Sequence, residues 1–340
     1  MATETKVERQ RRPATSPSGR TNRLRAWWPV LALVLVAVVL RFADPRDVAW
    51  IQNLVVVFGS LLVEAVPFVA LGAFVSATIE VFVPPGVFLR IGRLPRTLQL
   101  PAAAMAGMAF PVCECGSVPV ADRLARKGLT PAAAVTFMLA APIVNPVVIA
   151  STYVAYRGRD VVGLMVFGRL TLGFLIAIAV GWVIGTKRSD ELLRARRPAV
   201  DQHVDEHGRT TRFFGHLSGD LLFMGRFLIV GAAIAAAIQT FVPQTILDGV
   251  ADLPVLSIVA MMALAYVMSL CSESDAFVAA SFIQFTAPAQ LAFLVFGPMV
   301  DTKLSALYVG TFGRGFLRTV VLSVGSITLV AVLWIEVLLP

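Results

Sequence analysis

The sequence has little charge for its length. Lys, Arg, Asp and Glu make up 15% of its 340 residues, whereas hydrophobic residues make up 57%. A water-soluble domain of this size needs more charge to cover its surface, so a soluble fold is excluded. Several apolar stretches exceed the roughly 20 residues that span a bilayer core as a helix, and they lack the alternation of barrel strands. The composition therefore predicts an all-α polytopic membrane protein, with the lipid bilayer as its partner.

The sequence also lacks the motifs of soluble enzymes. It has no Gly-rich phosphate-binding loop and hence no ATPase of its own. We expect neither an enzyme activity nor a cofactor. Histidine is scarce, and His203 and His207 are spaced to share one helical face. Because Asp205 and Glu206 lie between them, a solvated loop is a simpler interpretation than a metal site.

The positive charge, +8 overall, is concentrated in two polar segments. One precedes the apolar stretch Ala26–Phe42, and the other lies between residues 187 and 217. Basic clusters beside apolar spans are typical of cytoplasmic segments, so we expect no nucleic-acid partner. We expect a protein of the cell (inner or plasma) membrane with a cytoplasmic N-terminus. The predicted parts are a disordered basic tail (1–25), an extra transmembrane helix (26–42), a first repeat (50–186), a cytoplasmic basic linker (187–217) and a second repeat (218–340).

The two halves of the chain resemble each other. Gly72 and Gly231 occupy similar places in them, as do the tripeptides Phe-Val-Pro at 82–84 and 241–243. Duplicated halves are typical of transporters, whose substrate site lies where the repeats meet near mid-membrane. Further along the chain, one interval of 156 residues relates these pairs: Cys115 and Cys271, Thr130 and Thr286, Phe137 and Phe293, Pro142 and Pro298, and Asn145 and Asp301.

Basic residues between 123 and 127 indicate how the halves are oriented. They stay cytoplasmic if 101–128 enters the membrane and returns to the same side. Each half then has three crossings and one re-entrant or broken element, and this odd number inverts the second copy. The matching stretch near Cys271 contains Glu273 and Asp275 but no Lys or Arg, as an outward-facing copy should. We therefore predict two pseudo-symmetric, inverted repeats with broken or re-entrant helices at mid-membrane.

Polar side chains and helix-breaking residues interrupt the apolar segments at matching places. Stretch 110–120 contains two prolines and a glycine, and stretch 268–276 contains two carboxylates and three hydroxyls. Broken backbone at membrane depth is tolerated only inside protein or around a cavity, and a central carboxylate costs about 2.5–3.5 kcal/mol. These segments are the predicted site. We predict helix breaks at Pro119, Pro142, Pro146 and Pro298; substrate-binding residues Cys113, Cys115, Cys271, Ser117 and Asn145; and intramembrane polar residues, suited to coupling, at Glu114, Glu273, Asp275 and Asp301.

The chain has three cysteines, and all of them fall in these paired motifs: Cys113, Cys115 and Cys271. Convergence of their thiols would favour a soft, thiophilic ligand. The alternative is that they pack as small apolar side chains. Asn145 and Asp301 likewise have two interpretations, since they could bind a cation or carry a proton, or only cap the broken helices.

These motifs resemble those of the ArsP/YraQ-type permease family, described as organoarsenical efflux permeases. The resemblance extends from about residue 50 to the C-terminus. It implies export of trivalent, often methylated arsenic, a small metalloid substrate that Cys113, Cys115 and Cys271 would hold as As(III). The residues that carry the resemblance are Cys113-Glu114-Cys115-Gly116-Ser117-Val118-Pro119, Thr130-Pro131, Phe137, Pro142, Asn145-Pro146 and Cys271-Ser272-Glu273-Ser274-Asp275.

Our working hypothesis is alternating access, in which Glu273, Asp275 or Asp301 couples export to proton entry. One alternative is a permease for another small solute, with structural cysteines. A passive channel is a second. A membrane thiol oxidoreductase using Cys113 and Cys115 is a third, although the single intervening residue disfavours it. The sequence does not indicate the oligomeric state.

Overall fold

The computed structural model describes residues 49–84, 86, 92, 94–109, 113–186, 209–241 and 254–338. The predicted tail (1–25), the predicted helix 26–42, and His203 and His207 lie outside these residues. Within the described part, all regular secondary structure is helical, so the predicted all-α fold is confirmed. The helices are α2 (Ala49–Phe82), α4 (Arg96–Ala109), α5 (Glu114–Arg126), α6 (Pro131–Val144), α7 (Pro146–Ala155), α8 (Val162–Thr186), α10 (Arg209–Phe241), α11 (Pro254–Met268), α12 (Asp275–Ser281), α13 (Ala287–Phe296), α14 (Thr302–Thr311) and α15 (Arg314–Leu338).

Long apolar helices identify the chain as a multi-pass membrane protein. Bulky side chains such as Phe74, Trp182 and Trp334 are exposed on them, as expected of surfaces that face lipid. One of these stretches, which comprises α6 and α7, is instead mostly buried within the protein. The stretches of described chain that are long and apolar enough to cross a bilayer are Trp50–Phe82, Pro131–Ala155, Val162–Gly185, Thr210–Thr240 and Arg314–Leu338.

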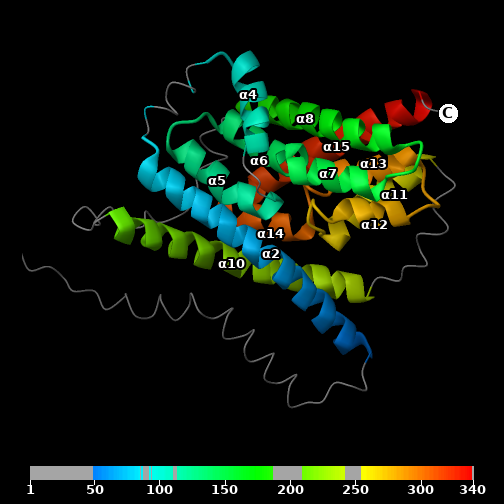
Figure 1. Cartoon of the computed structure of the whole chain (residues 1–340), viewed down its shortest axis with the longest axis horizontal. Coiled ribbons are helices and arrows are strands. Elements are labelled where there is room, and N and C mark those ends of the chain that lie inside the picture. Colours follow the sequence, from blue (N-terminus) through cyan, green and yellow to red (C-terminus); the bar gives the residue numbers. More distant parts are fainter. Residues whose placement is uncertain are drawn as a thin grey trace, which may run out of the picture. The chain divides into compact units, whose positions relative to one another are not determined.

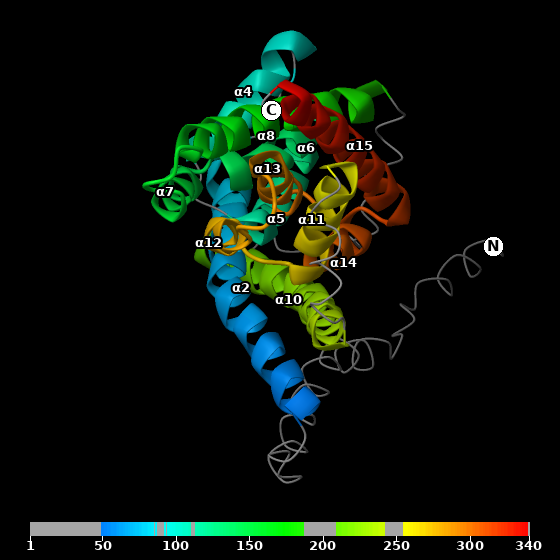
Figure 2. The same cartoon turned by 90° about the vertical axis from the view of Figure 1, so that its right-hand side faces the viewer.

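The helix contacts form a pattern that occurs twice. In the first half α6 contacts both α4 and α8, and in the second half α13 contacts both α11 and α15. The long helices α2 and α10 pack against each other, as Figure 1 shows, and each also contacts a short central helix: α2 contacts α5, and α10 contacts α14. Figure 2 gives the same arrangement from the side, with α5, α13 and α14 among the longer helices. The short helices are therefore shielded from lipid by the long ones.

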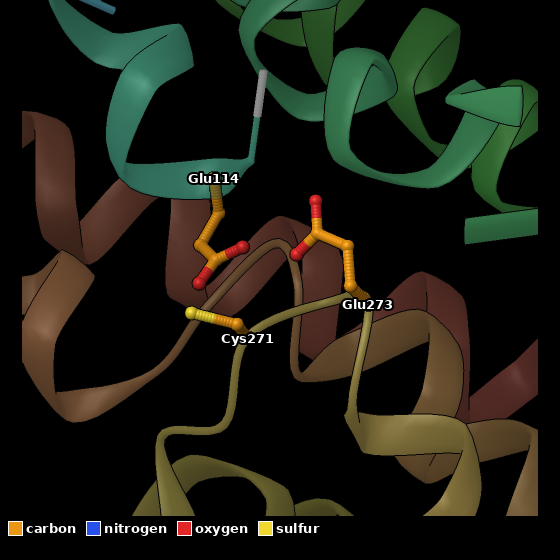
Figure 3. Close-up of side chains that lie close together, drawn as sticks. All are labelled: Glu114, Cys271 and Glu273. Atoms are coloured by element: carbon orange, nitrogen blue, oxygen red, sulfur yellow. The ribbon is translucent and has the colours of Figure 1, made fainter. Parts of the chain in front are cut away.

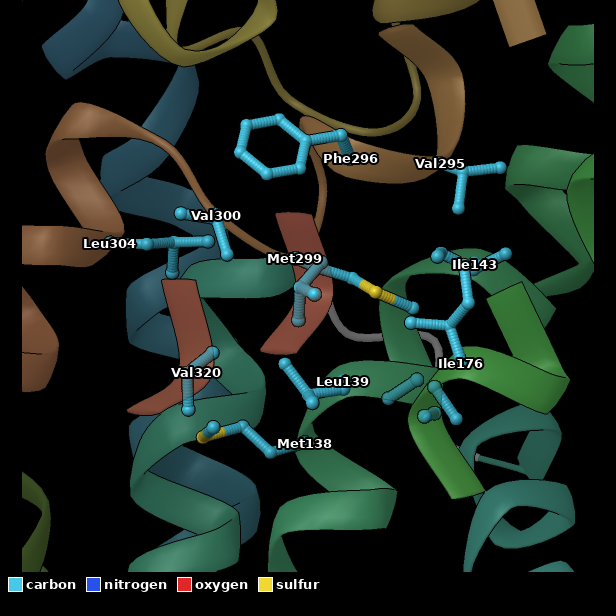
Figure 4. Packing of buried hydrophobic residues seen from close by; sticks show 14 of the residues in the cluster. Met138, Leu139, Ile143, Ile176, Val295, Phe296, Met299, Val300, Leu304 and Val320 are labelled. Carbon is cyan, nitrogen blue, oxygen red and sulfur yellow. The ribbon is translucent and has the colours of Figure 1, made fainter. Parts of the chain in front are cut away.

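The apolar core is shared by the two halves. Figure 4 shows Met138 and Leu139 of α6 near Met299 and Val300, which follow α13, and Val320 of α15. All five side chains are buried. Because this core joins segments from both halves, neither half buries its apolar face alone.

The interruptions of the central helices have local causes. Asn145 ends α6 and caps α7, its side-chain oxygen accepting a hydrogen bond from the Val147 amide at 3.0 Å. Asp301 caps α14 in the same way, accepting from the Leu304 amide at 2.6 Å. Thr130 and Thr286 cap α6 and α13 through equivalent bonds of 3.3 Å. Each cap satisfies a backbone donor that lipid would leave unpaired.

The boundary of one element differs from the sequence-based expectation, and a second element is unusually long. Helix α10 begins at Arg209, within the segment 187–217 that was assigned to the linker. Helix α2 runs continuously through Pro67 for 34 residues, although a proline inside a helix removes one backbone hydrogen bond. In both cases packing between α2 and α10 supports helix beyond the length that a bilayer core alone requires.

Candidate functional site

The candidate site forms where three broken segments meet. These are the start of α5, the non-helical turn between α11 and α12, and the start of α14. Ten of the 13 residues of α5 are buried, so its irregular start lies inside protein rather than in lipid. This placement makes the polar groups of the three segments available to one another and to a bound solute.

Glycines bring the long helices close enough to hold these segments. A Cβ at Gly72 of α2 would lie 2.4 Å from the Gly116 Cα, so only glycine permits this approach of α2 to α5. A Cβ at Gly231 of α10 would lie 2.8 Å from the Lys303 Cα of α14. The close approach of α2 to α5 therefore positions Glu114, and the close approach of α10 to α14 positions Lys303.

Two carboxylates and a thiol form the centre of the site. Figure 3 shows Glu114 facing Cys271 and Glu273, and one ligand atom from each residue lies within 4.8 Å of the other two. Glu114 and Cys271 are each 1% exposed, and Glu273 is partly buried. We refer to Glu114, Cys271 and Glu273 as the acid–thiol cluster.

Ser272 holds the acid–thiol cluster together. Its amide and hydroxyl both donate to Oε2 of Glu114, at 3.4 and 3.1 Å. The same hydroxyl lies 3.4 Å from Oε2 of Glu273. On the other side, Lys303 Nζ lies 3.7 Å from Oε1 of Glu114, and both side chains are almost fully buried. This distance allows electrostatic attraction but is too long for a hydrogen bond.

A buried ion pair anchors the turn that carries Cys271 and Glu273. Arg169 of α8 donates two hydrogen bonds to Asp275, at 2.9 and 2.7 Å. It also donates to the Thr152 hydroxyl at 2.9 Å and to the Ser272 carbonyl at 3.1 Å. A second bond, from the Ser274 hydroxyl to Glu64 at 2.8 Å, ties the turn to α2. The turn is therefore fixed by α8 on one side and by α2 on the other.

The structure separates the predicted site residues into groups. Glu114, Cys271 and Glu273 come together, whereas Asp275 is neutralised by Arg169. All three cysteines are buried and free of disulfides. Cys271 belongs to the acid–thiol cluster, whereas Cys113 and Cys115 flank Glu114 in the sequence without belonging to it.

The remaining predicted residues serve the backbone. The Ser117 hydroxyl donates to the carbonyls of Glu114 and Met138, at 2.9 and 3.0 Å. Asn145 and Asp301 cap helices, as described above. The predicted helix breaks at Pro119 and Pro142 are wrong, because α5 and α6 continue through these prolines at the loss of one backbone hydrogen bond each. Pro146 begins α7, and Pro298 lies in the turn after α13.

Two cations at the site were not predicted. Arg169 is the single charged residue in the 25 residues of α8, and that isolation is a signal that it needs a buried partner. Lys303 lies two residues after Asp301, and side chains at that spacing on a helix do not face each other. Its interaction with Glu114 depends on packing between α14 and α5, which sequence spacing does not reveal.

Comparisons with known proteins agree with this architecture. The sequence matches the ArsP_1 family, described as predicted permease, over residues 50–337. It is 39% identical over 267 residues to UPF0718 protein YcgR of Bacillus subtilis, which covers 76% of this chain and 89% of that protein. It is 33% identical over 266 residues, 77% of this chain and 87% of the relative, to a protein of Streptococcus mutans whose name describes a subunit of a two-component membrane permease complex. No solved structure matches the chain.

The suspected family relationship is thus confirmed over nearly all of the described residues. With its long apolar helices and a polar site buried among broken ones, the chain belongs to the ArsP_1 family of membrane permeases.

Proposed function

We propose that this permease exports a small thiophilic solute, such as trivalent methylated arsenic, and binds it at the acid–thiol cluster. The observation that carries the proposal is the meeting of Glu114 with Cys271 and Glu273, from distant parts of the sequence, inside a helical membrane protein. Buried carboxylates and thiols at membrane depth are costly and are typical of substrate or ion pathways. The preference for arsenic comes from the family resemblance of the motifs.

Thiol chemistry supports a thiophilic solute. A monomethylated trivalent arsenic atom has two bonds available for thiolates. Cys271 lies in the acid–thiol cluster, and Cys113 and Cys115 flank Glu114 of the same cluster. Two thiolates from this set would complete the bonds of the arsenic atom.

The paired architecture supports alternating access by two inverted repeats. The caps Asn145 and Asp301 stand at equivalent positions of the two halves, as do Thr130 and Thr286. Transporters built from repeats change access by rocking one set of helices against the other around a central site. Helices α2 and α10 are the natural moving pair, because they pack on each other and contact the site through close glycine approaches.

Proton coupling is assigned to Asp301 within this proposal. Asp275 is unsuited because Arg169 binds both of its oxygens. Asp301 uses one oxygen to cap α14, and its Oδ2 is buried with no hydrogen-bond partner among the described residues. That oxygen is free to accept a proton. Asp301→Asn preserves the cap oxygen, and we expect it to fold normally but to lose the dependence of export on the proton gradient.

The test of the proposal is uptake of methylated arsenite into everted membrane vesicles. We expect Cys271→Ser to abolish uptake, and Cys113→Ser or Cys115→Ser to reduce it. The control is Glu336→Gln, at a partly buried carboxylate of α15 outside the acid–thiol cluster, and it should transport normally. Normal uptake by all three cysteine variants refutes the thiol site, and no uptake by the unmodified protein refutes arsenic as the substrate.

A permease for a different small solute, with structural cysteines, is the second candidate. Full burial of all three thiols favours it, because cysteine also packs well as a small apolar side chain. A panel of solutes tested in a deletion strain separates the candidates. Transport of a solute without thiol affinity, unchanged in Cys271→Ser, supports the second.

A further inference from the structure

The acid–thiol cluster also has the ligands of a metal site. We propose that Glu114, Cys271 and Glu273 bind a divalent cation of borderline softness, such as Zn²⁺ or Cd²⁺. The inference uses the same site as the proposed function and names a second class of ligand for it. It does not require that arsenic is transported.

The spacing of the three donors suits a small cation. A tetrahedral zinc ion bonds sulfur at about 2.3 Å and oxygen at about 2.1 Å, which places two donors on one ion roughly 3.5 Å apart. The donor atoms of Glu114, Cys271 and Glu273 lie within 4.8 Å of one another. Small side-chain rotations therefore close the group around one ion, while a solute or water takes the fourth position.

An unsatisfied oxygen gives independent support. Oε1 of Glu114 is buried and accepts no hydrogen bond from any described residue, while Ser272 donates to the other oxygen. Figure 3 shows this carboxylate directed toward Cys271 and Glu273. Lys303 Nζ, 3.7 Å from this oxygen, is too distant to donate a hydrogen bond to it, so a metal ion bound directly to Oε1 would supply the contact that the oxygen lacks.

The local charge favours a cation over an oxyanion. Arg169 neutralises Asp275, so the charges that remain around the cluster are the carboxylates of Glu114, Glu273 and Glu64, which accepts from Ser274 of the same turn, and the ammonium of Lys303. Among the described residues named here, three negative groups face one positive group. A divalent cation reduces this excess, whereas an anion increases it.

The donor types select the kind of cation. Calcium and magnesium prefer sites made only of oxygen ligands. A thiolate with two carboxylates suits zinc and its softer analogue cadmium. Lys303 also sets a limit, because its proximity to Glu114 disfavours any ion that needs both oxygens of that carboxylate.

The experiment is a Cd²⁺ titration of the full-length protein purified in detergent, followed by calorimetry and by the ultraviolet charge-transfer band of cadmium thiolate. We expect one Cd²⁺ per chain with that band, competition by Zn²⁺, and no binding of Mg²⁺. Cys271→Ser should abolish the band, and Glu273→Gln should weaken affinity at least about tenfold, as loss of a metal ligand does. Glu336→Gln is the matched control and should bind normally.

Each other outcome overturns the inference. Absence of saturable Cd²⁺ binding refutes the site. A band that survives Cys271→Ser but disappears in Cys113→Ser or Cys115→Ser places the metal on the other thiols. Because Glu273 is only partly buried, its variant tests the site even if the buried substitutions fail to fold.

Transport assays on the same preparations keep the two proposals distinct. Cadmium binding without transport of methylated arsenite supports the metal site and refutes arsenic as the substrate. Transport of methylated arsenite that depends on Cys271, without any cadmium binding, supports arsenic as the substrate and refutes the metal site.

Discussion

Breaking the ion pair between Arg169 and Asp275 should release the turn that carries two of the three residues of the acid–thiol cluster, Cys271 and Glu273. The side chains are 2% and 3% exposed, and their closest atoms lie 2.7 Å apart. In Arg169→Met the apolar volume is kept, but Asp275 loses both charge-assisted hydrogen bonds. Thr152 and the Ser272 carbonyl lose a donor as well. We expect a large loss of stability together with a loss of transport.

The magnitude follows from what remains buried. Removing one partner of a buried ion pair costs about 3–5 kcal/mol, because the other charge stays without compensation. Adding up the four hydrogen bonds of Arg169 would count the same desolvation several times, so we take this range as the whole effect. In Arg169→Met/Asp275→Asn neither charge remains, and the double variant should recover about 1–3 kcal/mol relative to the sum of the single variants.

Thermal unfolding of the two single variants and the double variant in detergent micelles measures this coupling. Arg157→Met, at an exposed arginine in the same half, is the control and should unfold like the unmodified protein. The reasoning is refuted if Arg169→Met is no more destabilised than Arg157→Met. It is also refuted if the effects of Arg169→Met and Asp275→Asn simply add.

Two further substitutions test how α2 is held. Gly72→Ala should destabilise the protein by about 1–3 kcal/mol, seen as a lower melting temperature, because the added Cβ would overlap Gly116. Gly59→Ala is the control and should be neutral, because no described atom lies within 4 Å of the added Cβ. Equal melting temperatures for the two variants would contradict the close approach of α2 to α5. Lys127 donates three hydrogen bonds, of 2.7–2.8 Å, to carbonyls at the end of α2, and burial lowers its pKa from the ordinary value. Lys127→Met should lower the free energy of unfolding by about 1 kcal/mol in the same assay, and Lys127→Arg should lower it less. An unchanged melting temperature in Lys127→Met would show that Lys127 does not stabilise the end of α2.

The sequence predicted the site segments better than the contacts within them. Buried polar and helix-breaking residues marked the regions around Cys113 and Cys271, because such residues are costly in an apolar span wherever it packs. The role of Ser117 was less predictable, since a hydroxyl in a broken helix can face a solute or a carbonyl. In the structure it donates to two carbonyls. Only the packing of the neighbouring helix α6, which supplies the Met138 carbonyl, shows that this hydroxyl faces a carbonyl and not a solute.

The length and composition of the apolar runs by themselves determined that this protein is helical and spans a membrane, because backbone groups in lipid must be satisfied within each segment. Asn145 and Asp301 likewise determined where α7 and α14 begin, since capping is local, whereas α5 and α6 continue through Pro119 and Pro142. The tertiary structure alone decided that Glu114 meets Cys271 and Lys303, and that Arg169 is the partner of Asp275. Those contacts join residues far apart in the chain and depend on how closely the helices approach, which no local pattern encodes.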